Sequence, residues 1–247
     1  MNRFAFPCLL VPFGLALPMQ ASAADQVVAF NASARVEIDA AGRPVKVEAP
    51  SDLPQPVREF IEKRVASWQY SPAMRDGVAQ PGTTYVWLGA CAIPEGEGYR
   101  LAVEFKGNGP RHSDGKPLAW PGYPDGARRR GVGGKFEVIA AIAPDGTTTP
   151  ESITPGQEDE RWNDAFTTVL EQWVRRMRFD PEQVGGQGVA SRIRIPVVFS
   201  ARGPSRKELA QGVEETRTTD ECRLASGAAA GPQPIALDSS IKVTPSG

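Results

Sequence analysis

The chain has 247 residues, with 28 Lys and Arg against 29 Asp and Glu and a single His. This balance excludes a strongly charged surface and gives no indication of nucleic acid as a partner. The lone His, without paired Cys or a Ser nucleophile signature, argues against a metal site and against hydrolase chemistry, so we expect no cofactor and no enzymatic activity.

Residues 1–23 have the pattern of a secretory signal peptide. Arg3 lies in a short basic start, residues 4–19 are mainly apolar, and Ala21, Ser22 and Ala23 form a small-residue cleavage site. The apolar run contains three prolines and is shorter than the roughly 20 residues that a spanning helix needs. We therefore expect cleavage after Ala23, export, and a mature chain with no membrane span.

Residues 24–106 predict a first α+β unit. Apolar and polar residues alternate over 34–39 and 45–48, which indicates a hairpin with one buried face. A helix is expected next, followed by strands over 83–90 and 99–105. The residues expected on the buried face of the helix are Val57, Phe60, Ile61, Val65 and Trp68.

Residues 107–119 are rich in Gly, Pro and Ser and predict a linker. The second unit, residues 120–202, then repeats the plan of the first: a strand over 135–142, a turn at Asp145 and Gly146, a helix over 162–177 and a last strand over 193–199. Residues 203–247 are polar and small, and we expect an irregular tail.

The two units place matching residues at one offset. Trp68, Tyr70 and Pro72 are followed 109 positions later by Met177, Phe179 and Pro181. A duplicated α+β domain, each copy a small antiparallel sheet packed against a helix, accounts for this order most simply.

The second unit resembles the C-terminal domain of TonB, a periplasmic domain of Gram-negative bacteria. The resemblance rests on Tyr123 and Pro124 before a short helix, Gly134 at the first strand, the Phe179-Asp180-Pro181 exit from the main helix, and the last apolar strand. It implies two tandem TonB-like units, the first one degenerate. Unlike membrane-tethered TonB proteins, this chain has no Pro-rich charged spacer.

The resemblance implies a non-catalytic periplasmic module that binds an extended peptide or an envelope protein by strand addition at a sheet edge. Pro196 places the last strand at such an edge, because proline cannot donate to a ladder, although it equally protects an edge against pairing. The alternative is a membrane-anchored energy transducer that keeps its leader. The candidate peptide-binding residues are Tyr123, Pro124, Arg192, Ile193, Arg194, Ile195, Pro196, Val197, Val198 and Phe199.

Two cysteines remain after cleavage, since Cys8 lies in the leader. In an oxidising compartment we expect a bond between Cys91 and Cys222, with two free thiols as the alternative. The chain-entropy model gives such a long loop a stabilisation of roughly 4 to 5 kcal/mol.

Two further features have simple interpretations. Arg128, Arg129 and Arg130 before several glycines superficially suggest a phosphate loop, but the expected order of helix, glycines and strand is the reverse of what that loop requires. His112 lies in the expected linker, where we predict an exposed and inert side chain.

Overall fold

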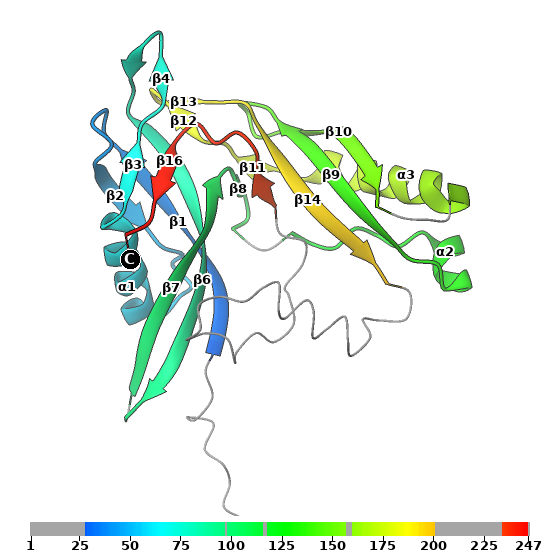
Figure 1. Ribbon diagram of the computed structural model, residues 1–247, viewed down its shortest axis with the longest axis horizontal. Helices are drawn as coiled ribbons and strands as arrows, with labels where there is room; N and C mark the ends of the chain where they lie inside the picture. Colours follow the sequence, from blue (N-terminus) through cyan, green and yellow to red (C-terminus); the bar gives the residue numbers. More distant parts are fainter. Residues whose placement is uncertain (1–27, 97, 116–117, 157–159, 201–233, 247) are drawn as a thin grey trace, which may run out of the picture.

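The structure is a computed structural model that describes residues 28–96, 98–115, 118–156, 160–200 and 234–246. It is rich in sheet, with few helices, as the predicted α+β class requires. Two main sheets lie side by side, one against α1 and the other against α3 (Figure 1). In the described ranges, no helix is long and apolar enough to cross a membrane.

The first sheet is built on a long central pair of strands. β6 pairs antiparallel with β1 on one side and with β7 on the other, and β2 extends the sheet beyond β1. Ile61, Val65 and Trp68 lie at 1%, 0% and 4% exposure, so α1 and its exit cover one face. The elements are β1 (Val28–Ile38), β2 (Pro44–Glu48), α1 (Gln55–Ala66), β3 (Gln69–Ser71), β4 (Met74–Arg75), β5 (Val78–Ala79), β6 (Gly82–Glu95), β7 (Gly98–Gly109) and β8 (Arg111–His112).

The second sheet has the order β10-β9-β14-β15, with α3 on its buried face. The helix buries Phe166, Leu170, Trp173 and Val174, the i, i+4, i+7 and i+8 spacing of an amphipathic helix. The elements in this part of the chain are α2 (Asp125–Arg130), β9 (Gly134–Ile142), β10 (Thr148–Pro155), α3 (Glu160–Arg176), β11 (Phe179–Asp180), β12 (Gln183–Val184), β13 (Gln187–Gly188), β14 (Ser191–Phe199), β15 (Ile235–Ala236) and β16 (Lys242–Thr244). Of these, β12 and β13 belong to the first sheet, where β12 pairs with β6.

The two halves share their element order and their turn geometry. Asp39 N–H donates to the Arg43 carbonyl at 2.9 Å, and Ala143 N–H donates to the Thr147 carbonyl at 2.9 Å. Gly42 and Gly146 have φ of +76° and +82°. A Cβ on either would lie about 2 Å from the carbonyl oxygen of the aromatic residue in the short strand after its helix, Tyr70 of β3 (2.1 Å) or Phe179 of β11 (2.0 Å). Both turns therefore need glycine for the same two reasons.

Two stretches that were expected to lack structure contain strands. β7 runs to Gly109 and β8 pairs with β11, so part of the predicted linker over 107–119 belongs to the sheets. In the predicted irregular tail, β15 pairs with β14 and β16 pairs with β3. The segment 234–246 thus contacts both halves of the molecule.

Candidate functional site

The outer edge of β14 is defined by the direction of its backbone groups. Leu237 N–H donates to the Arg192 carbonyl at 2.9 Å, and Arg192 N–H donates to Asp238 Oδ1 at 2.7 Å. Because successive residues of a strand point their backbone groups to opposite sides, the groups of Arg194, Pro196 and Val198 also face outward. The Phe199 carbonyl points the other way, since a Cβ on Gly133, just before β9, would lie 2.2 Å from it.

This geometry explains the position of Pro196. Its nitrogen, which has no hydrogen, faces the outer edge, so the ladder between β14 and β9 continues unbroken through Pro196↔Glu137. The proline removes one donor from the outer edge only. The carbonyl of Pro196 and both backbone groups of Val198 remain as edge groups.

Among the strands that the structure describes, a partner is found only for the first part of this edge. β15 pairs with Ile193 and Arg194, which takes up the start of the predicted binding strand. Along residues 195–199, no strand of the described ranges lies on the outer side of β14 (Figure 1). The candidate site is therefore narrower than the sequence predicted.

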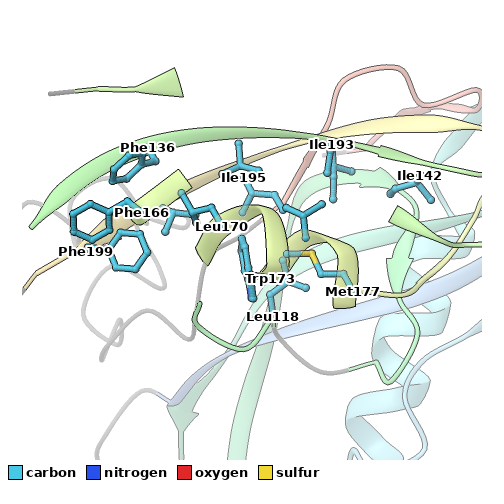
Figure 2. Close-up of a cluster of buried hydrophobic side chains, with 14 of the residues drawn as sticks. Leu118, Phe136, Ile142, Phe166, Leu170, Trp173, Met177, Ile193, Ile195 and Phe199 are labelled. Atoms are coloured by element: carbon cyan, nitrogen blue, oxygen red, sulfur yellow. The ribbon is translucent and has the colours of Figure 1, made fainter. Parts of the chain in front are cut away.

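The core-facing side chains of β14 fix the strand firmly. Ile193, Ile195, Val197 and Phe199 are at most 6% exposed. Phe199 ends the strand in an aromatic cluster with Phe136 and Phe166, and the ring centroids of Phe166 and Phe199 lie 4.7 Å apart (Figure 2). These buried side chains thus anchor the open part of the edge to the core.

The other face of β14 carries charges that are already paired. Arg192 bonds Asp238 Oδ2 at 3.0 Å and lies 3.5 Å from Glu151, and Arg194 lies 3.5 Å from Glu137. The hydrogen bond with Asp238 raises the pKa of Arg192. All these side chains are well exposed, so each pair contributes little to stability. The two arginines hold neighbouring segments of this chain.

Tyr123 and Pro124 do not lie on the edge. Tyr123 donates its hydroxyl to the Val132 carbonyl at 2.6 Å, and its ring meets Phe199 edge to face at 5.3 Å. Burial raises the pKa of Tyr123. Pro124 is the N-cap of α2. Tyr123 therefore packs against the end of β14 through its ring.

A buried carboxylate, missed at the sequence level, joins the two halves to the segment 234–246. Glu182 is 0% exposed and accepts hydrogen bonds from Thr84 Oγ1 at 2.5 Å, Ser239 Oγ at 2.8 Å and Ser240 N–H at 2.9 Å. Burial raises the pKa of Glu182, although the three donors oppose that shift. The only sequence signal for Glu182 was that a charged residue stands where the first half has Ala73, 109 positions earlier.

In the described residues, no three His, Cys, Asp or Glu side chains are placed so that they could hold a metal ion. His112 lies on β8, packs against Phe179 and contacts Asp114 through Nδ1. Gly131, at φ +68°, ends α2 before β9 begins. The order is therefore helix, glycine and strand, as predicted, whereas a phosphate loop has its glycines before a helix.

Cys91 on β6 is completely buried and is disulfide-bonded. Cys222 lies outside the described residues, as does the predicted leader. The pairing of Cys91 with Cys222 therefore stays a prediction.

Residues 120–201 match the family model described as Gram-negative bacterial TonB protein C-terminal. The match spans α2 to β14, about a third of the chain, and is to one copy, so a second TonB-like copy in the first half stays a prediction. Neither the curated proteins nor the solved structures contain a match to this chain. The TonB C-terminal domain is a periplasmic domain of Gram-negative bacteria, and residues 120–201, which carry the candidate edge, match the model of that domain.

Proposed function

We propose that this protein is a non-catalytic periplasmic binding module, which receives an extended segment of an envelope protein or peptide on the outer edge of β14. The observation that carries the proposal is the edge over residues 195–199, which no strand of the described ranges pairs. The added strand would run antiparallel to β14 and continue the line of β15. Strand addition of this kind is a recurring mode of peptide recognition.

The first half of the chain supports this mode with an example of its own. β6 occupies the place in the first sheet that β14 occupies in the second, because each is the long strand after its helix and pairs with the strand that opens its unit, β1 or β9. β7 lies along the outer edge of β6 from Tyr85 to Glu95. A sheet of this architecture therefore accepts a strand at this position.

The available groups set the strength and selectivity of the interaction. The Pro196 carbonyl and the two backbone groups of Val198 allow about three hydrogen bonds, each contributing roughly 0.5 to 1.5 kcal/mol. Val198, which is 50% exposed, adds an apolar contact. We expect weak binding that depends on main-chain geometry and tolerates many side chains in the ligand.

The proposal is tested with peptides of five to eight residues selected from a random display library against the purified protein. Val198→Pro removes the last outward N–H of the open stretch and should reduce binding of the selected peptides at least about fivefold, the loss of one hydrogen bond. Val198→Thr keeps that donor and a β-branched side chain, and serves as the matched control. Equal binding to both variants would show that the peptides use another surface.

We also infer that the chain is exported through its leader and that both halves derive from one TonB-like unit. The duplication is supported by the matching turns at Gly42 and Gly146 and by a second correspondence. Gln80 N–H donates to the Ala73 carbonyl, and 109 positions later Val189 N–H donates to the Glu182 carbonyl. An ancestral strand-accepting edge would then have been filled by β7 in one copy and left partly open in the other.

A further inference from the structure

The segment 234–246 divides into two parts that are held differently. Its later part, which we call the anchor, is residues 239–246. Within the anchor, Ile241 is fully buried in the core of the first sheet, and two serines donate to the buried carboxylate of Glu182. Figure 1 shows the segment running from β14 to β3, where β16 pairs. The anchor is therefore held without any contribution from residues 235–238.

The earlier part, residues 235–238, which we call the resident strand, is held mainly by polar contacts with the edge of β14. Leu237 N–H donates to the Arg192 carbonyl at 2.9 Å, and Ile235 lies opposite Arg194 in the register. The side chains of Ile235 and Leu237 are 44% and 42% exposed, so they bury little apolar surface on the protein. The resident strand thus has the contacts of a bound peptide, with main-chain pairing and half-exposed side chains.

The resident strand also shows which side chains this part of the edge accepts. Asp238 accepts the backbone N–H of Arg192 on Oδ1 at 2.7 Å and its side-chain Nε–H on Oδ2 at 3.0 Å. One carboxylate thus replaces the carbonyl that a continuing strand would offer and pairs with the arginine. At Ala236 the strand passes close to β7, since a Cβ on Gly109 would lie 2.6 Å from Ala236 Cβ. The edge therefore fits a small residue followed two positions later by an acidic one.

We propose that the resident strand is a built-in competitor for the β14 edge, and that a longer foreign strand of similar chemistry displaces it and pairs with β14 along residues 191–199. This inference rests on the proposed function, because it extends the same edge beyond the open stretch, residues 195–199. The partner is an extended protein segment in which four consecutive residues are apolar, small, apolar and acidic. The residues that precede these four pair with the open stretch, and the anchor stays in place.

The first half of the chain shows that this position accepts strands of different origin. β12 pairs with the outer edge of β6 at Gly82 and Thr83, which lie 109 positions before Ser191 and Arg192. A strand from the second half therefore fills this position in the first sheet, and the resident strand contacts the matching position in the second. The position thus selects an extended backbone more than one particular sequence.

The length of the foreign strand decides the competition. The resident strand and the matching part of a ligand make the same hydrogen bonds, and the resident strand has the advantage of being attached. A ligand confined to residues 191–194 of β14 gains nothing over it. A ligand that also pairs with the open stretch gains about three further hydrogen bonds, each of which strengthens binding roughly twofold to tenfold. The resident strand therefore admits long strands and excludes short ones from this part of the edge.

A nine-residue peptide tests the displacement. The probe is fluorescein-Lys-Thr-Val-Thr-Val-Ile-Ala-Leu-Asp-amide, which carries the resident sequence after five residues that reach the open stretch. The double variant Ile235→Pro with Leu237→Pro removes both N–H groups that the resident strand turns toward β14. Fluorescence polarisation with the purified protein should show about tenfold tighter binding of the probe to this variant than to wild type.

Matched controls separate the backbone from the side chains. Ile235→Val with Leu237→Val keeps both N–H groups and should bind the probe within about threefold of wild type. A second probe, with Ala in place of the final Asp, should bind the proline variant at least about threefold more weakly, because it lacks the carboxylate that pairs with Arg192.

Hydrogen exchange follows the displacement in the wild-type protein. Saturating probe should raise the exchange rate of the Leu237 amide about tenfold or more, whereas the Ser240 amide, which donates to Glu182, should keep its rate. Equal binding to the proline and valine variants, no binding to the proline variant, or an unchanged Leu237 rate would overturn the proposal. A probe that is weakened by Val198→Pro alone would overturn only the displacement, and the proposed function would stand.

Discussion

Val197 and Val198 are neighbours on β14 whose backbone N–H groups point to opposite sides of the strand. The Val197 N–H faces β9, where the register pairs it with Phe136, and the Val198 N–H faces the outer edge. Replacing each in turn with Pro removes one donor from each side. The pair of variants therefore tests the geometry on which the proposed function depends.

The expected magnitudes differ because, within the described residues, only the Val197 N–H lies on the side of β14 that is paired with another strand. Val197→Pro leaves a buried carbonyl of β9 unpaired, which costs about 1 to 3 kcal/mol. It also changes the shape of a side chain that is 1% exposed, at a further cost of about 1 to 3 kcal/mol. Val198→Pro breaks no ladder bond between β14 and β9. Proline also restricts the unfolded chain, which raises the free energy of unfolding by about 0.4 to 1 kcal/mol and offsets part of any loss.

Urea unfolding of the two variants measures the difference directly. We expect Val197→Pro to lower the free energy of unfolding by about 3 kcal/mol or more and Val198→Pro to change it by less than about 1 kcal/mol. Val197→Ala and Val198→Ala keep the backbone N–H groups, so they measure the change in the free energy of unfolding that comes from losing each valine side chain alone. Equal losses in the two proline variants would mean that the N–H of Val198 is paired within the protein, and the open edge would not exist.

Two further predictions concern the buried carboxylate and the disulfide. Because burial raises the pKa of Glu182 above its ordinary value of 4.5, the folded state binds that proton more tightly than the unfolded state. The contribution of Glu182 to stability therefore increases as the pH falls from 7 toward about 4.5 and is lost as the pH rises through the raised pKa. Urea unfolding at pH 7 and pH 5 should show that the free energy of unfolding of wild type, relative to that of Glu182→Gln, is larger at the lower pH. An unchanged difference between the two proteins would contradict this assignment. For the disulfide, native protein should contain no alkylatable thiol, and Cys222→Ser should lower the free energy of unfolding by roughly 4 kcal/mol; two free thiols would exclude the bond with Cys91.

The second unit was predictable because each of its elements buries one face. The alternation of apolar residues over 193–199 indicates which side chains of β14 enter the core, and Ile193, Ile195, Val197 and Phe199 are at most 6% exposed. The expected burial of Trp68 and Trp173 is also confirmed, at 4% and 6%. Pro196 indicated a sheet edge, and its nitrogen does face outward. Each of these signals is local in the sequence.

The features that the sequence did not predict depend on contacts between distant segments. β15 and β16 are two and three residues long, too short for a periodic pattern, and they form only because β14 and β3 provide edges. Gly107 suggested a linker, but it lies at a bulge of β7 against the ring of Trp87. A glycine in a strand and a glycine in a linker have the same sequence signature.

The open stretch of β14 favours a foreign strand over a second copy of the chain. The open stretch of β14 has no opposite charges, and pairing it with itself about Pro196 would bring two residues that lack an N–H together on the hydrogen-bonding side. β14 is therefore poorly suited to a second copy and is suited to a foreign strand whose own N–H groups reach the Pro196 carbonyl.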